Sequence, residues 1–264
     1  MSEPAVRVTQ QAAVVTVELN RPEARNALDT RTKVALLAAL RDVATEPSVR
    51  CLVLTGSGAV FCSGQDLKEH AAALAAGDLD GLFATVPEHY NPIALALHEL
   101  DVPVIAGVNG IAAGAGTALA LLADYRLLSE SAGINVAFAR IGLSCDTGTS
   151  WTLPRLVGPT RAMELLLNAR TVSASEALAI GLATEVVPAD QFQARLTELA
   201  ATLATGPTLA YAAIRHSLAF SASHSLAESL EFEGGQMRRT GATEDHRLAV
   251  ESFLGKQSPT FTGR

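Results

Sequence analysis

The stretch that most constrains the fold runs from Val104 to Asp124, VIAGVNGIAAGAGTALALLAD. We expect a short buried strand over 104–108, a turn that contains glycines, and then a helix of small and aliphatic residues. Gly110, Gly114 and Gly116 let the backbone turn tightly and let another segment or a ligand approach closely. The helix carries no charge before Asp124, so it has to be buried on nearly every side.

The start of this helix is a candidate site for a negatively charged oxygen. The first backbone N–H groups of a helix have no intrahelical partners, and the helix dipole makes this end attractive to negative charge. An apolar pocket beside it would stabilise an oxyanion. A tightly packed core helix with glycines for close contact explains this stretch equally well.

The same order of strand, glycine turn and helix occurs earlier, from Val49 to Leu67. A buried strand, VRCLVL, is followed by a turn at Gly56–Gly58 and by FCSGQDL, which opens a helix. If the two strands are neighbours in a parallel sheet, both turns emerge at the same edge, where ligands bind in α/β folds. Two backbone N–H groups would then converge on one oxygen. Two ordinary crossover connections are the alternative.

The rest of the chain predicts an α/β fold with a helical last quarter. Residues 6–18 alternate in polarity and indicate a hairpin or a pair of strands, and Asp29 or Thr30 caps the helix that follows. The alanine-rich segment 69–92 has no strong periodicity, and we expect it to be mobile. From residue 190 onward we expect amphipathic helices, with breaks at Gly206-Pro207, Gly234-Gly235 and Gly241.

Composition limits the partners. The 264 residues are 48% hydrophobic and 18% charged, an apolar balance that suggests burial of further surface in an oligomer. A net charge of −7 argues against nucleic acid as the main partner but leaves room for an anionic cofactor on a local basic patch.

Location and metal binding are also limited by the sequence. No apolar run reaches membrane-spanning length, and the amino end has no signal-like pattern, so we expect no membrane partner and a cytoplasmic location. Three cysteines without ligand spacing indicate reduced thiols and no metal site. Dinucleotide, P-loop, GxSxG and HExxH motifs are missing. The six histidines are scattered along the chain, and we expect them to be surface residues rather than ligands or bases.

Five segments in order resemble the crotonase superfamily, the enoyl-CoA hydratase/isomerase family. They are LNRPEARNALD, LTGSGAVFCSGQDL, PVIAGVNGIAAGAG, ARIGLSCDTGTSWTLPRLVG and TEDHRLAVESFLGK, and together they span nearly the whole chain. The resemblance implies a spiral of ββα units in an acyl-CoA-binding core over 1–200. It implies a helical region over 201–264 that builds trimers, or hexamers as dimers of trimers. It also implies an acyl-CoA thioester substrate, which carries coenzyme A into the site without a separate cofactor.

The resemblance also implies roles for individual residues. The oxyanion hole falls on the backbone N–H groups of Gln65 and Ala115. The tail residues Phe253 and Lys256 match an aromatic residue and a lysine that reach the coenzyme A of a neighbouring subunit, although Lys256 is as readily a solvated tail residue. The full set of matched coenzyme A contacts is Ala24, Arg25, Ala27, Ser63, Asp66, Leu67, Gly114, Phe253 and Lys256.

Two positions depart from the family's hydratases, which use two glutamates to add water. This chain has Ala118 and Phe138 there. Neither side chain can move a proton, so the mechanism with two glutamates is not available.

One carboxylate remains in the matched motifs, Asp146 in LSCDTG. Several family members that are not two-glutamate hydratases carry their catalytic acid at this position. Leu143, Cys145 and Trp151 are apolar enough to raise its pKa by desolvation and so improve it as a base. A turn or helix-capping role is the alternative, and Glu69 and Glu88 are lesser candidates for the base.

We therefore expect an enzyme that isomerises the double bond of an enoyl-CoA through an enolate, with one carboxylate base. Atypical hydration, decarboxylation, thioester hydrolysis and ring-forming synthesis use the same kind of site. A non-catalytic acyl-CoA binder is the alternative from a different class.

Overall fold

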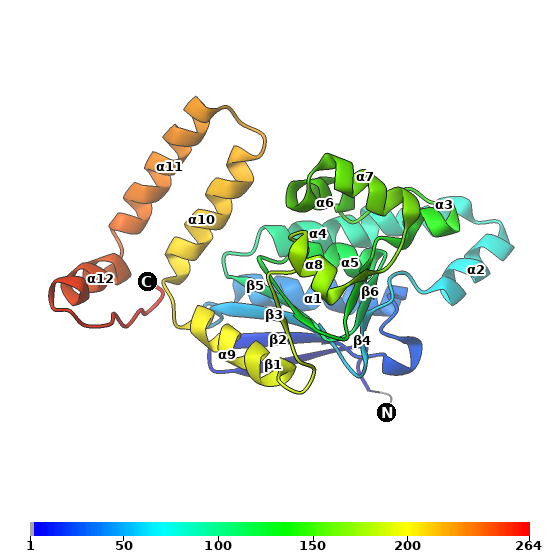
Figure 1. The fold of residues 1–264 in the computed structure, drawn as a ribbon, viewed down its shortest axis with the longest axis horizontal. Helices are drawn as coiled ribbons and strands as arrows, with labels where there is room; N and C mark the ends of the chain where they lie inside the picture. Colours follow the sequence, from blue (N-terminus) through cyan, green and yellow to red (C-terminus); the bar gives the residue numbers. More distant parts are fainter. Residues whose placement is uncertain (1–2) are drawn as a thin grey trace.

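The computed structural model describes residues 3–264, which form two β-sheets, a layer of helices between and around them, and a projecting pair of helices (Figure 1). The larger sheet runs in the order β1 (Val6–Gln11), β2 (Val14–Leu19), β3 (Cys51–Gly56), β5 (Val104–Val108), β7 (Tyr125–Ser129) and β10 (Glu185–Val187). The smaller sheet runs in the order β4 (Val60–Cys62), β6 (Ile111–Ala113), β8 (Gly133–Asn135) and β9 (Val172–Ser173).

The chain passes from the larger sheet to the smaller in the same way three times. The pairs β3–β4, β5–β6 and β7–β8 each pass from the larger sheet to the smaller, and helices follow. Within each sheet these successive strands are parallel neighbours. The repeated ββα unit forms the predicted spiral, and the α/β fold class is confirmed.

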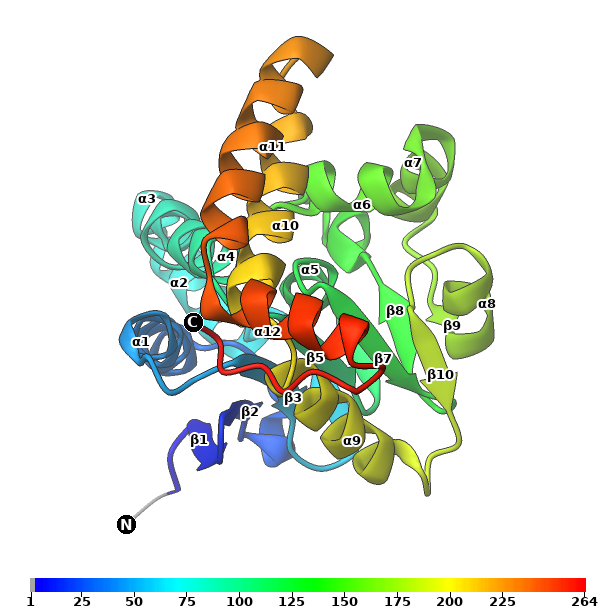
Figure 2. The same ribbon diagram turned by 90° about the vertical axis from the view of Figure 1, so that its left-hand side faces the viewer.

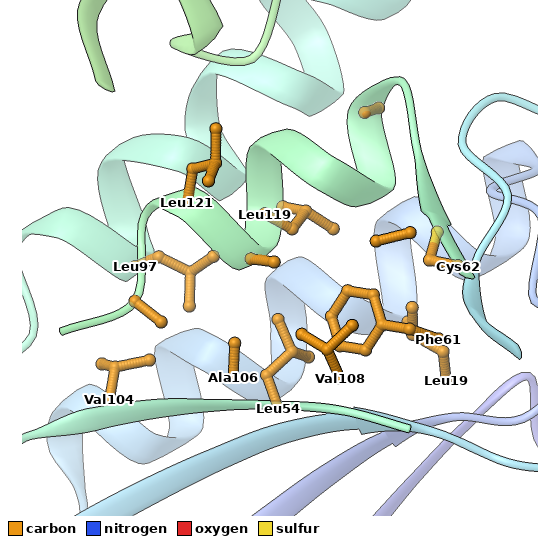
Figure 3. Packing of buried hydrophobic residues seen from close by; sticks show 14 of the residues in the cluster. Leu19, Leu54, Phe61, Cys62, Leu97, Val104, Ala106, Val108, Leu119 and Leu121 are labelled. Atoms are coloured by element: carbon orange, nitrogen blue, oxygen red, sulfur yellow. The ribbon is translucent and has the colours of Figure 1, made fainter. Parts of the chain in front are cut away.

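The two strands that the sequence singled out are adjacent, as predicted. β3 pairs with β5 in parallel, with Leu52 beside Val104 and Thr55 beside Gly107. Both strands are buried on both faces, which explains their unbroken apolar runs. One face packs against α1 (Thr30–Thr45), α4 (Asn91–His98) and α5 (Ala115–Leu121), and Figure 3 shows Leu119 and Leu97 above Leu54 and Ala106. The other face packs against α9 (Phe192–Ala204).

Helix α5 is buried at every position, as its lack of charge predicted. Two of its neighbouring glycines allow close contacts: a Cβ at Gly116 would lie 2.5 Å from the Cys62 carbonyl oxygen, and one at Gly110 would collide with the backbone of Ala59. Gly114 has a φ of +52°, the left-handed region that favours glycine. These glycines therefore bring the β6–α5 turn against β4.

Segment 69–92, expected to be mobile, is helical. It contains α2 (Leu67–Ala76), α3 (Leu79–Thr85) and a π-helical turn (Val86–Tyr90). Asp66 caps α2 and Asp78 caps α3 through their carboxylates, as Asp29 caps α1. The remaining helices before α9 are a 3₁₀ turn (Pro22–Ala24), a second 3₁₀ turn (Ala137–Ile141), α6 (Thr149–Val157), α7 (Pro159–Asn168) and α8 (Ala174–Ala179).

The carboxyl-terminal region projects from the core as an antiparallel pair, α10 (Thr208–Ser221) and α11 (Leu226–Gly241), followed by α12 (Glu244–Leu254) (Figures 1 and 2). The predicted boundary at residue 200 falls inside α9, which packs on the sheet, so the change to projecting helices comes at Gly206-Pro207. The predicted break at Gly234-Gly235 is wrong, because α11 continues through both glycines. No helix within residues 3–264 has the length and apolar character needed to cross a membrane.

Two arginines attach α10 to the core. The Arg50 side chain, just before β3, donates to the Gly206 carbonyl (2.5 Å), the Thr208 hydroxyl (2.9 Å) and the Phe261 carbonyl (3.2 Å). Further along the helix, Arg215 pairs with Asp124 and donates to the carbonyls of Leu97 and His98, both at 3.1 Å. The start of α10, its middle and the end of the chain are thus all held to the core.

Candidate active site

A cavity of about 130 Å³ lies where the α2–α3 segment faces the start of α5 and the segment 137–146. Its wall is mostly apolar and includes Phe83, Val86, Phe138 and Leu143. The predicted residues Gln65, Gly114, Ala115 and Asp146 all line it. The structure therefore brings the proposed oxyanion donors and the proposed base into one enclosure.

The two predicted donors have unused N–H groups. Neither the Gln65 nor the Ala115 amide donates a hydrogen bond within residues 3–264. Gln65 forms a parallel bridge with Leu28 in which Leu28 donates to Gly64 and accepts from Asp66, so the Gln65 N–H points away from Leu28. Ala115 is the first residue of α5, where the N–H has no intrahelical partner.

Gly64 sets how closely these two segments approach. Its φ is +87°, and a Cβ there would lie 2.8 Å from the Ala113 carbonyl oxygen and 3.4 Å from the Ala115 nitrogen. Any other residue would push the two turns apart. The convergence predicted from the paired glycine turns is thus a contact between residue 64 and the start of α5.

Asp146 has the environment expected of a base. Its Oδ1 accepts a hydrogen bond from the Thr147 hydroxyl at 2.8 Å, and its Oδ2 accepts none within the described chain. Burial raises the pKa of this carboxyl above its ordinary value, and the Thr147 hydrogen bond opposes the shift. Asp146 does not cap α6, which begins at Thr149 with Gly148 as its N-cap and has no side-chain cap. Asp146 does open a turn, because its carbonyl accepts from the Thr149 N–H at 2.9 Å, and this role leaves its carboxylate free. Leu143 shares the cavity as predicted, whereas Trp151 packs against His98 and Arg155 instead.

The other acids considered from the sequence lie elsewhere. Among residues 3–264, Asp146 is the only carboxylate that lines the cavity. Glu69 caps Thr30 of α1, accepting from its N–H and its hydroxyl at 3.0 Å. Ala118 is fully buried within α5, and Phe138 forms part of the apolar wall.

A surface groove leads into this cavity. Its lining includes most of the predicted coenzyme A contacts, namely Ala24, Arg25, Ala27, Ser63, Asp66 and Leu67. Ser63, Gln65 and Leu67 line both the groove and the cavity, so the two adjoin. The Asn26 amide holds the loop in place through the carbonyls of Ser57 (2.9 Å) and Val60 (2.7 Å). Asp66 also has a structural role, because it pairs with Arg21 at 3.1 Å.

Phe253 and Lys256 are not part of this gathering within one chain. Phe253 lies in the last turn of α12 and is 82% exposed, and Lys256 follows the helix. Their predicted contact with coenzyme A in a neighbouring subunit stays a prediction.

Sequence reasoning missed a buried polar cluster beside Gln65. The Gln65 Oε1 accepts from the Tyr90 hydroxyl at 2.5 Å and from the Lys33 Nζ at 3.2 Å, and Lys33 also donates to the Thr85 hydroxyl at 2.6 Å. Lys33 lies on the same helical face as the buried Leu36 and Leu40, and a lysine in that register was the available signal. His70, predicted to be a surface residue, lines the cavity.

Sequence comparison agrees with this geometry. A family model described as enoyl-CoA hydratase/isomerase matches residues 9–264. A probable enoyl-CoA hydratase of Rhodobacter capsulatus is 40% identical over the full length of both chains. The 1,2-epoxyphenylacetyl-CoA isomerase of Escherichia coli is 37% identical over 96% of this chain and 97% of its own.

Solved structures agree as well. The fold matches that of an enoyl-CoA hydratase/isomerase homologue from Mycobacterium abscessus with a TM-score of 0.94 and 42% identity, covering 98% of this chain and all of the other. An enoyl-CoA hydratase from Bacillus anthracis matches with a TM-score of 0.92 and 29% identity, covering 98% and 100%. With its sequence match and its spiral of ββα units, the chain belongs to the enoyl-CoA hydratase/isomerase family of enzymes.

Proposed function

We propose that this enzyme moves the double bond of a 3-enoyl-CoA into conjugation with the thioester, with Asp146 as its only base. The observation that carries the proposal is a single buried carboxylate, with one oxygen unpaired, in the cavity that the Gln65 and Ala115 amides also line. The Asp146 Oδ2 removes a proton from C2, and the electron pair moves onto the thioester oxygen as a dienolate. The same proton then returns to C4, so no other reactant is consumed.

The two amides account for the stabilisation of the dienolate. A single preorganised oxyanion donor typically contributes about 3–4 kcal/mol to the transition state. The apolar wall keeps the local dielectric low and strengthens both hydrogen bonds. Groove residues, including Arg25, would hold the coenzyme A portion outside the cavity.

The cavity favours a compact apolar acyl group. Its volume, about 130 Å³, is close to that of the engineered apolar protein cavity of about 150 Å³ that binds benzene. Aromatic side chains line it, including Phe83 and Phe138. We therefore propose an acyl group up to the size of a six-membered ring, a choice also supported by the relative named 1,2-epoxyphenylacetyl-CoA isomerase.

Hydration is the second candidate, because other relatives are named as hydratases. It needs one group to activate water and one to protonate C2, and the described cavity offers one carboxylate for both tasks. Isomerisation needs a single proton shuttle, which is what the site holds.

Purified parent enzyme and Asp146→Asn, each given a 3-enoyl-CoA and a 2-enoyl-CoA, test this proposal. Parent turnover of the 3-enoyl-CoA, with a loss of about 10²–10⁴-fold in kcat for Asp146→Asn, supports it. A parent that hydrates the 2-enoyl-CoA without isomerising overturns it in favour of hydration. A parent that binds both compounds and turns over neither supports the acyl-CoA binder.

A further inference from the structure

Lys33 is a fully buried ammonium whose presence stability does not explain. Its side chain is 0% exposed, and its nearest carboxylate oxygen, of Glu69, lies 3.7 Å from Nζ on a side chain that is 40% exposed. A buried charge costs several kcal/mol of desolvation, and an apolar replacement of similar size is often neutral or stabilising. Burial lowers the pKa of the Lys33 ammonium, an effect that Glu69 opposes.

The contacts of this ammonium converge on one oxyanion donor. Lys33 and Tyr90 both donate to the Gln65 Oε1, at 3.2 and 2.5 Å, so both acceptor positions of this oxygen are occupied. Lys33 also lies over the Tyr90 ring, 5.2 Å from its centroid, and holds the Thr85 hydroxyl of α3. The Gln65 side chain is therefore fixed from two sides, which adds to the Leu28 bridge in holding the segment that carries the Gln65 N–H.

We propose that Lys33 is a positioning residue: through the Gln65 side chain it orients the Gln65 N–H toward the thioester oxygen, and its charge favours the enolate that forms there. This inference rests on the proposed function for its chemical readout, because an enolate has to form for that charge to matter. Lys33 would thus contribute to catalysis without touching the substrate.

The charge of Lys33 also reaches the base. It lowers the pKa of Asp146, opposing the effect of burial, and so helps to keep that carboxylate ionised near neutral pH. The charged groups that face Lys33 are Glu69 of α2, Asp29 at the start of α1 and Asp66 before α2. Tyr90 contacts Lys33 and lines the same cavity as Asp146, and burial raises the pKa of its hydroxyl, so it stays neutral.

The kinetic test compares Lys33→Met with Thr30→Val. Methionine keeps the length of the side chain and removes the charge. Thr30→Val removes a different bond of α1, from Thr30 to Glu69 of α2, without touching Gln65. We expect Lys33→Met to lower kcat by about 10–100-fold with KM within about threefold, and Thr30→Val to match the parent. An unchanged kcat in Lys33→Met overturns the proposal, as does an equal loss in Thr30→Val.

A double-mutant cycle tests whether Lys33 acts through Gln65. Gln65→Met keeps the backbone N–H and removes the amide oxygen. If both residues act as one unit, Lys33→Met combined with Gln65→Met loses little more kcat than either alone. Losses that multiply would show that Lys33 acts by another route and would overturn the positioning role.

A titration without substrate separates this inference from the proposed reaction. In protein labelled with ¹³C at aspartate carboxyls, the Asp146 signal is identified by its loss in Asp146→Asn. We expect Lys33→Met to move the Asp146 midpoint to higher pH, because the substitution removes the charge that lowers it. An unmoved midpoint overturns the electrostatic role even if the parent isomerises. A moved midpoint supports it even if the parent turns over a different acyl-CoA.

If Lys33→Met does not fold, Lys33→Gln takes its place in every measurement. Its amide still donates to the Gln65 oxygen but carries no charge. We expect it to retain more kcat than Lys33→Met where both fold, with the same movement of the Asp146 midpoint. A kcat equal to the parent's with an unmoved midpoint would overturn the proposal.

Discussion

At the scale of single residues, the site is a compromise between stability and chemistry. Asp146 is held in an apolar wall where its charged form is disfavoured, and that same burial makes it a stronger base. The next residue, Thr147, has a φ of +52°, an uncommon conformation for a β-branched side chain. Its hydroxyl orients the Asp146 carboxylate. Strain and desolvation thus meet at the one acid that the proposed reaction needs.

The raised pKa of Asp146 predicts the pH dependence of turnover. The base acts only when ionised, so kcat should fall as pH decreases through the pKa of this carboxyl, at a pH above the ordinary aspartate value of about 4. A kcat profile from pH 4 to 9 measures this midpoint. A flat profile down to pH 4 would contradict the assignment of Asp146.

The same shift predicts that Asp146→Asn is more stable than the parent at pH 7. The folded-state pKa lies above the unfolded-state value, so the contribution of Asp146 to stability is complete below the unfolded pKa and is lost as pH rises through the folded one. Asparagine carries no charge to desolvate and can still accept from the Thr147 hydroxyl. We expect a higher Tm for Asp146→Asn at pH 7 and a smaller difference near pH 4. Thermal unfolding at both pH values gives the comparison.

The proposed oxyanion hole predicts a large loss of activity when the Ala115 N–H is removed. Ala115 is the first residue of α5, a position where helices accept proline, so Ala115→Pro removes the donor while the helix can still form. We expect a folded protein with a loss of at least about 10²-fold in kcat. An active, folded Ala115→Pro enzyme would count against this donor.

Gln65→Ala, in contrast, keeps the proposed donor, because that donor is a backbone group. It nevertheless removes the side-chain oxygen that accepts from buried Lys33 and Tyr90, so we expect a loss of activity. The sequence motif pointed to the Gln65 backbone and gave no sign of these contacts of its side chain. Contacts between α1 and the π-helical turn Val86–Tyr90 are long-range, and no local pattern encodes them.

At the scale of elements, predictability followed the strength of the local signal. The strands β3 and β5 and the helix α5 were predicted correctly, because burial on both sides leaves an apolar run that few structures satisfy. Segment 69–92 was predicted poorly. Its helices are short and largely exposed and depend on the Asp66 and Asp78 caps, so hydrophobic periodicity is weak there.

Helix α11 shows the limit of glycine as a helix breaker. Its Ser225–Glu228 capping box and sixteen residues outweigh a cost of about 1 kcal/mol for each of Gly234 and Gly235. Gly234 is exposed, and a Cβ there would meet nothing within 4 Å. We expect Gly234→Ala to raise the free energy of unfolding by about 0.5–1 kcal/mol, measured by urea denaturation. A loss of stability would mean that another surface covers this position.

At the scale of the whole molecule, the projecting helices α10 and α11 present an apolar surface that one chain does not cover. Leu218, Leu226 and Met237 are 71%, 75% and 74% exposed. Together with the family resemblance, this leads us to expect a trimer or a dimer of trimers. Sedimentation of the parent at micromolar concentration tests the expectation, with Leu226→Glu shifting the mass toward the monomer. A compact monomer for the parent would contradict it.

The two arginines that hold α10 determine how precisely the helix is oriented. Arg50 grips the base of α10 at Thr208, and Arg215 grips the helix seven residues later, about 10 Å along its axis. Two fixed points define a lever, and α10 runs about 9 Å beyond the second one before α11 turns back. A slip of about 2 Å at Arg50 would swing the far end by nearly as much in the opposite direction. We expect Arg50→Ala to leave the sheet and the cavity folded yet weaken self-association. Without Arg50 the angle of α10 is less well fixed, and its far end, which has to meet a partner, is placed less precisely.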